Sequence, residues 1–173
     1  MSAKFSYRNL PAVTQVPIMS QNKRYIPLNV GESAVLPDAN TLLYVTERCL
    51  KSRNLVNVIV AGKQPDRQWL DMEAAINHAS AGIGLWEWAC NDQPGEPDIV
   101  LASAGDVVTV EAVAAAEILK ARLPKSKVRF VNVVDLMTLY RPKDHPHGMS
   151  VKQFSDMFTD DVDVAIYYGR ANW

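Results

Sequence analysis

One short loop holds the residues of this sequence that are best suited to bind a ligand. Lys63 and Gln64 follow Gly62 at the end of the apolar run 55–61, which predicts a buried strand. In open α/β folds, ligands bind outside the carboxyl ends of the strands. A lysine there suits a phosphate or a carboxylate, so Lys63 and Gln64 are our candidate substrate-binding residues. A solvated loop lysine would give the same pattern, and this alternative stays open.

A second loop, Gly105-Asp106, joins a strand expected at 98–105 to a helix expected at about 108–122. Such a strand–glycine–helix junction resembles half of a phosphate-binding turn. The sequence has neither Gly-x-Gly-x-x-Gly nor Gly-x-x-x-x-Gly-Lys-Ser/Thr, which argues against dinucleotide and nucleoside-triphosphate sites. The structural alternative is tight strand–helix packing, with Asp106 or Thr109 as the N-cap.

The histidines and acidic residues give no strong metal signature. His145 and His147 flank a proline, a spacing that does not match a helical histidine pair, so we expect two loop histidines. Asp160, Asp161 and Asp163 are predicted to form an acidic turn before the last strand. We therefore predict no metal ligands and no catalytic residues, because no nucleophile–base signature is recognisable either.

The tryptophans and cysteines are more typical of packing than of catalysis. Trp86 and Trp88 would face the same way if they lay on a strand, and together with Trp69 they suit the core or an oligomer interface. Cys49 and Cys90 do not make a disulfide framework, so we expect two reduced thiols.

Alternating strands and helices must position these residues. We expect a three-layer α/β fold with a mostly parallel sheet and right-handed crossovers. Asp38 and Ser150 are predicted N-caps. Residues 1–37 carry little regular signal, and 82–89 could be a short strand or a turn. The expected strands are 55–61, 98–105, 127–134 and 162–168, and the expected helices are 38–53, 71–81, 108–122 and 150–158.

Composition excludes several classes of protein. The 173 residues are 48% hydrophobic and 21% charged, which argues against disorder. The 18 basic and 19 acidic residues leave a net charge of -1, so we expect no nucleic-acid partner. Neither an apolar signal core nor an apolar run of about 18 residues occurs, so we expect no membrane association and a cytoplasmic location.

Several longer stretches share one family's sequence pattern, in one order and with short gaps. Together they resemble the phosphoketolases, thiamine-diphosphate enzymes related to transketolase, over most of 36–169. The stretches are Leu-Pro-Asp-Ala-Asn-Thr-Leu-Leu (36–43), Arg-Asn-Leu-Val-Asn-Val-Ile-Val-Ala-Gly-Lys-Gln-Pro (53–65), Gln-Trp-Leu-Asp-Met (68–72), Ala-Gly-Ile-Gly-Leu-Trp-Glu-Trp-Ala (81–89), Glu-Pro-Asp-Ile-Val-Leu-Ala (96–102), Val-Arg-Phe-Val-Asn-Val-Val-Asp-Leu-Met (128–137) and His-Pro-His-Gly (145–148).

The resemblance implies an architecture and a reaction. Phosphoketolases have three α/β domains and cleave xylulose 5-phosphate or fructose 6-phosphate with inorganic phosphate, forming acetyl phosphate. On this basis residues 1–65 are a linker and the end of a pyrimidine-domain-like region. Residues 66–173 are then part of a transketolase-type C-terminal domain, and we expect a truncated chain. Thiamine diphosphate and Mg²⁺ belong to the full-length family, and we expect no cofactor in this chain alone.

Few functional residues of the family carry over. Lys63 matches the family's Gly-Lys-Gln lysine, which contacts substrate phosphate. Phe5-Ser6 looks like the remnant of a His-Asn-Gly-Phe-Ser-His motif, with Ser2 and Tyr7 at the two histidine positions. Neither side chain replaces imidazole in proton transfer near neutral pH without large tuning.

Three hypotheses of function follow. The first is a phosphoketolase (aldehyde-lyase) homologue without independent catalysis. It would be a scaffold or interaction module that forms homo-oligomers or associates with a full-length phosphoketolase. The second is a subunit of a split enzyme that supplies Lys63. The third is a binder of sugar phosphate or phosphate that uses Lys63, Gln64 and the Gly105-Asp106 turn.

Overall fold

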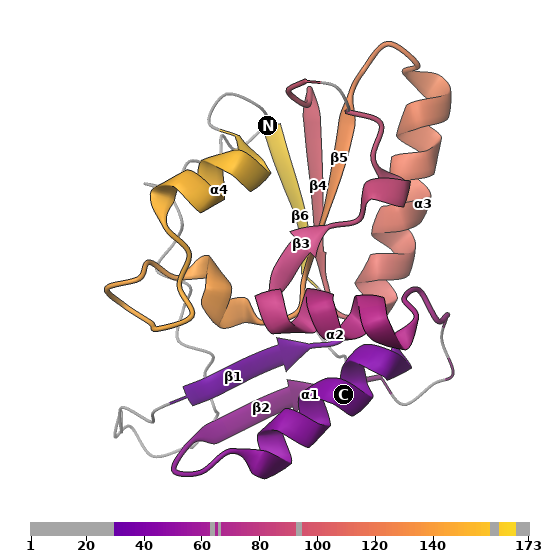
Figure 1. Cartoon of the computed structure of the whole chain (residues 1–173). Helices are drawn as coiled ribbons and strands as arrows, with labels where there is room; N and C mark the ends of the chain where they lie inside the picture. The colour runs from indigo at the N-terminus through magenta and orange to yellow at the C-terminus, as the bar shows by residue number, and fades with distance from the viewer. Residues whose placement is uncertain (1–29, 63–64, 66, 93–94, 160–162, 169–173) are drawn as a thin grey trace, which may run out of the picture.

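The computed structural model describes residues 30–62, 65, 67–92, 95–159 and 163–168 (Figure 1). Its strands are β1 (Val30–Val35), β2 (Val56–Val60), β3 (Ile83–Leu85), β4 (Ile99–Ala104), β5 (Val128–Val133) and β6 (Asp163–Tyr168). Its α-helices are α1 (Ala39–Lys51), α2 (Met72–Ala81), α3 (Asp106–Arg122) and α4 (Val151–Phe158), with 3-10 turns η1 (Glu87–Ala89) and η2 (Leu136–Leu139). The expected helices and strands are thus confirmed to within a few residues at each end.

A four-stranded sheet in the order β3-β5-β4-β6 forms the centre of the larger unit. β4 runs parallel to β5 and β6, whereas β3 is antiparallel to β5. Helix α3 lies on one side of this sheet and α4 on the other (Figure 1). The predicted α/β fold with a mostly parallel sheet is therefore confirmed, including its three layers.

Alternate residues of the central strands pack into two different cores. Val100 and Ala102 of β4 share one cluster with Phe154 and Phe158 of α4. Leu101, between them, belongs to a second cluster that contains the buried alanines of α3. This period of two is what a strand covered on both faces requires, and it explains why β4 reads as a continuous apolar run.

A smaller parallel sheet, β1–β2, is connected through α1. It meets the end of β5, where the Val35 amide donates to the Val134 carbonyl at 2.8 Å. Val45 of α1 and Ala79 of α2 pack against Val134 in a third cluster. The segment before residue 38 carries little regular signal in the sequence, although a short extended piece at Val30 is compatible with it; Val30–Val35 forms a strand because it has distant partners rather than strong local propensity.

Two of the predicted helix caps are confirmed and one is corrected. The Asp38 carboxylate accepts from the Thr41 amide, and Ser150 forms a capping box with Gln153. At α3 the cap position is Gly105, and Asp106 is the first helical residue. The Gly105 backbone has φ 109°, a conformation that a glycine adopts without strain.

The segment 82–89 resolves into a short strand and a turn. Gly82 ends α2 in the left-handed conformation and leads directly into β3, which pairs with β5 in the antiparallel direction. Trp86 follows β3 and Trp88 lies in η1, so the two tryptophans do not lie on one strand and the strand-face argument does not apply to them. Trp86 is buried, whereas Trp88 is 51% exposed.

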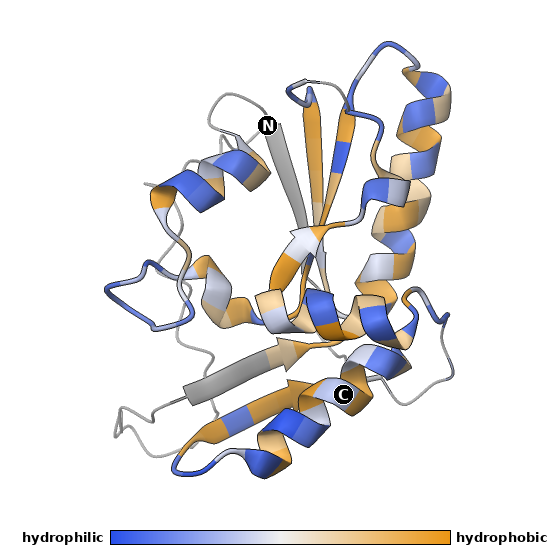
Figure 2. Cartoon of the chain, viewed as in Figure 1, coloured by the Kyte–Doolittle hydropathy of each residue, from blue (hydrophilic) through white to orange (hydrophobic). Residues whose placement is uncertain are grey.

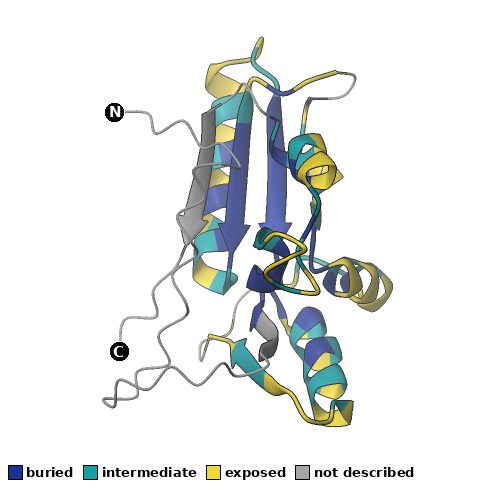
Figure 3. Ribbon diagram, turned by 90° about the vertical axis from the view of Figure 1, so that its left-hand side faces the viewer, coloured by how far each residue is buried: buried dark blue, intermediate teal, exposed yellow. Residues whose placement is uncertain are grey.

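Burial differs between the two sheets. Figure 2 shows β2 and β4 as mainly hydrophobic ribbons, but in Figure 3 β4 is buried while β2 is only partly covered. None of the helices in the described ranges combines the length and apolarity needed to cross a membrane.

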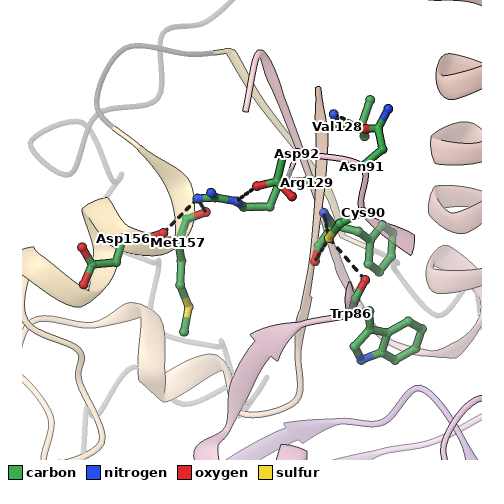
Figure 4. A network of polar contacts seen from close by, with 9 residues as sticks. Trp86, Cys90, Asn91, Asp92, Val128, Arg129, Asp156 and Met157 are labelled. Atoms are coloured by element: carbon green, nitrogen blue, oxygen red, sulfur yellow. Dashed lines mark hydrogen bonds and ion pairs between the residues drawn. The ribbon is translucent and has the colours of Figure 1, made fainter. Parts of the chain in front are cut away.

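Arg129 of β5 contacts two other segments of the chain, the loop that contains Asp92 and the end of α4 (Figure 4). Arg129 Nε lies 2.7 Å from Asp92 Oδ2, and both side chains are buried. The Arg129 Nη1 group donates to the carbonyls of Asp156 and Met157 near the end of α4. Arg129 therefore neutralises a loop carboxylate and satisfies carbonyls that a helix leaves open at its C-terminus.

Replacing Arg129 with methionine should destabilise the fold strongly, because Asp92 would remain as an unpaired buried charge. We expect Arg129→Met to lower the free energy of unfolding by about 3–5 kcal/mol, measured by denaturant titration.

Arg141→Met is a matched control, because Arg141 also lies 2.7 Å from an aspartate, Asp144, but at the surface. This change should cost at most about 1 kcal/mol. Equal losses in the two variants would contradict the assignment of Arg129 as a buried structural charge.

Candidate functional site

The two sheets meet near the carboxyl ends of β2 and β4. Gly62 follows β2 and lies against the carboxylate of Asp106, which follows β4. A Cβ atom on Gly62 would overlap that carboxylate. The fold thus brings the Gly62 loop and the Gly105-Asp106 turn together, although they are more than 40 residues apart.

The predicted binding residues Lys63 and Gln64 lie outside the described residues. The same holds for Ser2, Phe5 and Tyr7 of the motif-like N-terminal segment and for Asp160 and Asp161. Their roles stay predictions. The described part of the site consists of Gly62, the first turn of α3 and the residues behind them.

The first turn of α3 is occupied by its own carboxylate. Asp106 Oδ1 accepts from the Val107 amide at 2.7 Å. A phosphate bound at this N-terminus would compete with Asp106 for the Val107 amide, and the negative charge of Asp106 would repel it. This geometry favours the packing interpretation of Gly105-Asp106 over the phosphate-turn interpretation.

A chain of buried polar groups lies behind this edge, and sequence reasoning missed it. The Asn132 Nδ2 group donates to Ser103 Oγ at 3.1 Å and to Thr109 Oγ1 at 3.2 Å. Its Oδ1 atom therefore faces His78 Nε2, at 2.9 Å. Since that oxygen can only accept, His78 Nε2 carries the proton. The sequence indicated this chain of polar groups only through the polar residues Ser103 and Asn132 near the ends of the apolar strands β4 and β5.

Burial of His78 lowers the pKa of its imidazole. The hydrogen bond to Asn132 and the charge of Asp38 act in the opposite direction but are smaller. The ring also lies against Trp86, with 6.0 Å between ring centroids. His78 is therefore a neutral donor that holds α2 on β5, rather than a proton-transfer group for neutral pH.

His147 folds back onto the end of β5. Its Nδ1 atom lies 2.7 Å from Asp135 Oδ2, and the Asp135 side chain is only 10% exposed. The neighbouring ring of His145 stands edge-on to His147, with 5.0 Å between centroids. The expectation of two loop histidines holds for the described residues, but the carboxylate partner of His147 was not foreseen.

Three tryptophans form a compact aromatic cluster. Trp69 and Trp88 stack with centroids 5.8 Å apart, and Trp86 lies 5.3 Å from Trp88. Arg67 lies over Trp69 at 5.9 Å. Trp86 anchors the cluster in the core beside Phe130, which supports the packing role; an oligomer interface through Trp88 stays a prediction.

Cys90 is part of the same packing. Its thiol donates to the Trp86 carbonyl at 3.2 Å (Figure 4). The Phe130 amide donates to the Cys90 sulfur at 3.1 Å. Burial raises the pKa of the Cys90 thiol, partly opposed by the contact with Phe130. Cys49 and Cys90 are not joined in a disulfide, in line with the expectation of two reduced thiols.

Solved structures define the class of fold. A transketolase from Pichia stipitis superimposes with a TM-score of 0.60 at 18% identity, covering 84% of this chain and 19% of the enzyme. Transketolase from Leishmania mexicana gives a TM-score of 0.55 at 16% identity over 81% of this chain and 18% of that enzyme. The chain therefore has a transketolase-like α/β fold.

Sequence comparison is more specific. Residues 63–172 match the family model described as the XFP C-terminal domain, so the chain belongs to the XFP (phosphoketolase) C-terminal domain family. A probable phosphoketolase of Nitrosomonas europaea is 58% identical over 137 residues, which are 79% of this chain and 17% of that protein. A probable phosphoketolase of Nitrosospira multiformis is 50% identical over 88% of this chain and 20% of its own length. The chain thus spans about one fifth or less of the length of these relatives.

The described residues do not fit a metal–diphosphate site. In the ranges that the structure covers, no three His, Cys, Asp or Glu side chains gather as metal ligands would. We therefore assign no thiamine-diphosphate or Mg²⁺ contact to them and derive no catalytic step from them.

The lowered pKa of His78 predicts a loss of stability in mild acid. The unfolded chain binds a proton at His78 as the pH falls below about 6.5, while the folded chain does not until lower pH. Stability should therefore decline as the pH falls through this window, by at most about 1.4 kcal/mol per pH unit.

Denaturant titrations at several pH values would measure this slope in the wild type and in His78→Gln. The variant should lose less stability than the wild type between pH 7 and pH 5.5. Parallel curves for the two proteins would show that His78 titrates alike in the folded and unfolded states.

The raised pKa of Cys90 predicts slow alkylation. In Cys49→Ser, iodoacetamide should label Cys90 with a pH midpoint above the ordinary thiol value of about 8.5, because the thiolate is disfavoured by burial. The same variant in guanidinium chloride serves as the control. Equal labelling rates of the folded and unfolded protein at pH 7.5 would contradict the prediction.

Proposed function

We propose that this chain is a phosphoketolase homologue that acts by association rather than by independent catalysis. It docks through its β1–α1–β2 unit onto the thiamine-binding part of a phosphoketolase. The observation that carries this proposal is the uncovered apolar surface of that unit. In the family, the associated activity is the phosphate-dependent cleavage of xylulose 5-phosphate or fructose 6-phosphate to acetyl phosphate.

The smaller sheet leaves apolar side chains exposed. Val56 and Val60 are four positions apart in β2 and therefore lie on the same face of the strand, where they are 39% and 44% exposed. On the neighbouring helix α1, Leu43 and Leu50 are exposed to a greater extent. Parallel sheets normally have both faces covered, so this surface is suited to a further layer of protein.

The outer edge of β2 offers backbone groups as well. One edge of β2 pairs with β1, and β1 in turn approaches β5 through the bridge between Ala34 and Asp135. Within the described residues no strand pairs with the other edge of β2. A partner strand could add there through backbone hydrogen bonds while its side chains cover Val56 and Val60.

The position of this unit in the sequence supports a phosphoketolase as the partner. The family match begins at residue 63, after β2, and the longer relatives continue well beyond the segment that aligns with this chain. A protein that covers the exposed face of β2 would give this sheet the coverage that is usual for a parallel sheet.

A split enzyme is the second candidate, favoured by the position of Gly62 at the junction of the two sheets. Lys63, the next residue, would then contact substrate phosphate in the assembled enzyme. The stand-alone anion binder at this edge is less favoured, because Asp106 occupies the first turn of α3.

The docking proposal is testable by sedimentation velocity of the chain mixed with a full-length phosphoketolase. We expect a complex that the double variant Val56→Lys/Val60→Lys abolishes, because lysines would place charge on the apolar face. The matched control is Val107→Lys/Val151→Lys, which changes two exposed valines on α3 and α4 and should leave the complex intact.

Failure to bind at any accessible concentration would overturn the proposal, as would equal effects of the two double variants. In the same mixtures, acetyl phosphate formation separates the two candidates. A split enzyme requires activity that appears only on mixing and is lost in Lys63→Ala, whereas an interaction module does not depend on Lys63.

A further inference from the structure

Helix α2 is attached to the larger sheet by few buried groups. In Figure 1 it lies between that sheet and α1. Of its ten residues, Ala75 and Ala79 are the buried ones, and its outer face exposes Met72 and Ile76. The strand that follows it, β3, has three residues and pairs, within the described residues, only with β5. Segments with so little buried apolar area open locally before the rest of a domain unfolds.

The His78 imidazole links α2 and β3 to the central strand. It bonds to Asn132 of β5 beside Gly84 of β3, which is the residue paired with Asn132 in the sheet. A Cβ atom on Gly84 would lie 2.9 Å from His78 Nδ1, so a side chain there would push the ring away. Asn132 does not follow a moving ring, because its amide group donates to Ser103 and Thr109, which are both buried. The hydrogen bond between His78 and Asn132 therefore forms only while α2 and β3 keep their places on β5.

A second proton on this imidazole is poorly accommodated. Nε2 already carries the proton donated to Asn132, so a further proton goes to Nδ1. Nδ1 faces Gly84, and none of the described residues forms a hydrogen bond with it. The groups packed on the ring, Asn132, Gly84 and Trp86, are uncharged. Burial lowers the pKa of the imidazole by more than the bond to Asn132 and the charge of Asp38 raise it. An imidazolium gains full hydration by turning out toward solvent, and that movement breaks the bond to Asn132.

We propose that His78 is an acid-sensitive latch: the neutral imidazole holds α2 and β3 on β5, and the imidazolium releases them locally. The release ends at Trp86, which is buried beside Phe130. Strands β4 and β5 stay folded on α3, because the apolar cluster that joins them contains no residue of α2 or β3. The latch does not depend on the docking function proposed above.

Hydrogen–deuterium exchange of the 173-residue chain at pH 7 and pH 5.5 tests the latch, with rates corrected for the intrinsic pH dependence of amide exchange. We expect the protection of α2 and β3 to fall by about threefold or more between these pH values. Linkage to one proton limits the fall to about tenfold for each pH unit below about 6.5. The amides of β4 and of the second half of α3 should keep their protection.

Two variants connect this response to the imidazole. His78→Gln keeps an amide donor for Asn132 but does not take up a proton, so α2 should show the same protection at both pH values. Gly84→Ala places a methyl group against the ring and should lower the protection of α2 at pH 7 to that of the wild type in acid. This variant provides a second test if His78→Gln folds poorly, and circular dichroism would check the folding of both.

His145→Gln is the matched control, because it removes a titrating imidazole outside α2 and β3, and it should keep the wild-type response to pH. Equal protection of α2 at the two pH values in the wild type would overturn the proposal. An unchanged response in His78→Gln, or full protection of α2 in Gly84→Ala at pH 7, would do the same. A uniform loss over all segments in acid would also overturn it, because the release would then be global unfolding rather than a local opening.

Discussion

The carboxylate of Asp38 holds the two sheets of this molecule in one arrangement. It is 7% exposed and accepts from the amide and the hydroxyl of Thr41 at the start of α1. It also accepts from the amides of Trp69 and Leu70, in the segment that leads toward α2. One buried charge thus caps a helix of the smaller sheet and fixes the connection to the larger one, and its hydrogen bonds offset the cost of its burial.

This arrangement has two consequences for function. It aligns the end of β2 with the start of α3, so that Gly62 and Asp106 meet at one edge. It also presents the uncovered face and edge of β2 to the outside, beside the exposed leucines of α1. The first consequence concerns where a substrate anion would approach, and the second concerns what the chain would bind. The larger unit, in which the buried Arg129–Asp92 pair joins β5 to a loop, carries both features.

The sequence was informative wherever structure follows from local pattern. The apolar runs of β4 and β5, the spacing of α1 and the cap residues Asp38 and Ser150 all predicted the observed elements. The sequence pattern did not predict the extent of strand β1, because this strand depends on pairing with β2 and on contact with the end of β5. The partners of Arg129, His78 and His147 were not predicted either, since a single sequence does not show which distant residue faces a polar side chain. The clues that the sequence did offer were a charged residue inside an apolar strand, Arg129, and the polar residues at the ends of β4 and β5.

Hydrogen–deuterium exchange of the chain, alone and with a full-length phosphoketolase, tests the docking account most directly. If a partner strand adds to β2, the amides of Val56–Val60 should gain protection on mixing, while those of the second half of α3 and of α4, which pack on the larger sheet, should not change. Protection confined to α3 or α4, or no change at β2 under conditions in which a complex forms, would contradict the account.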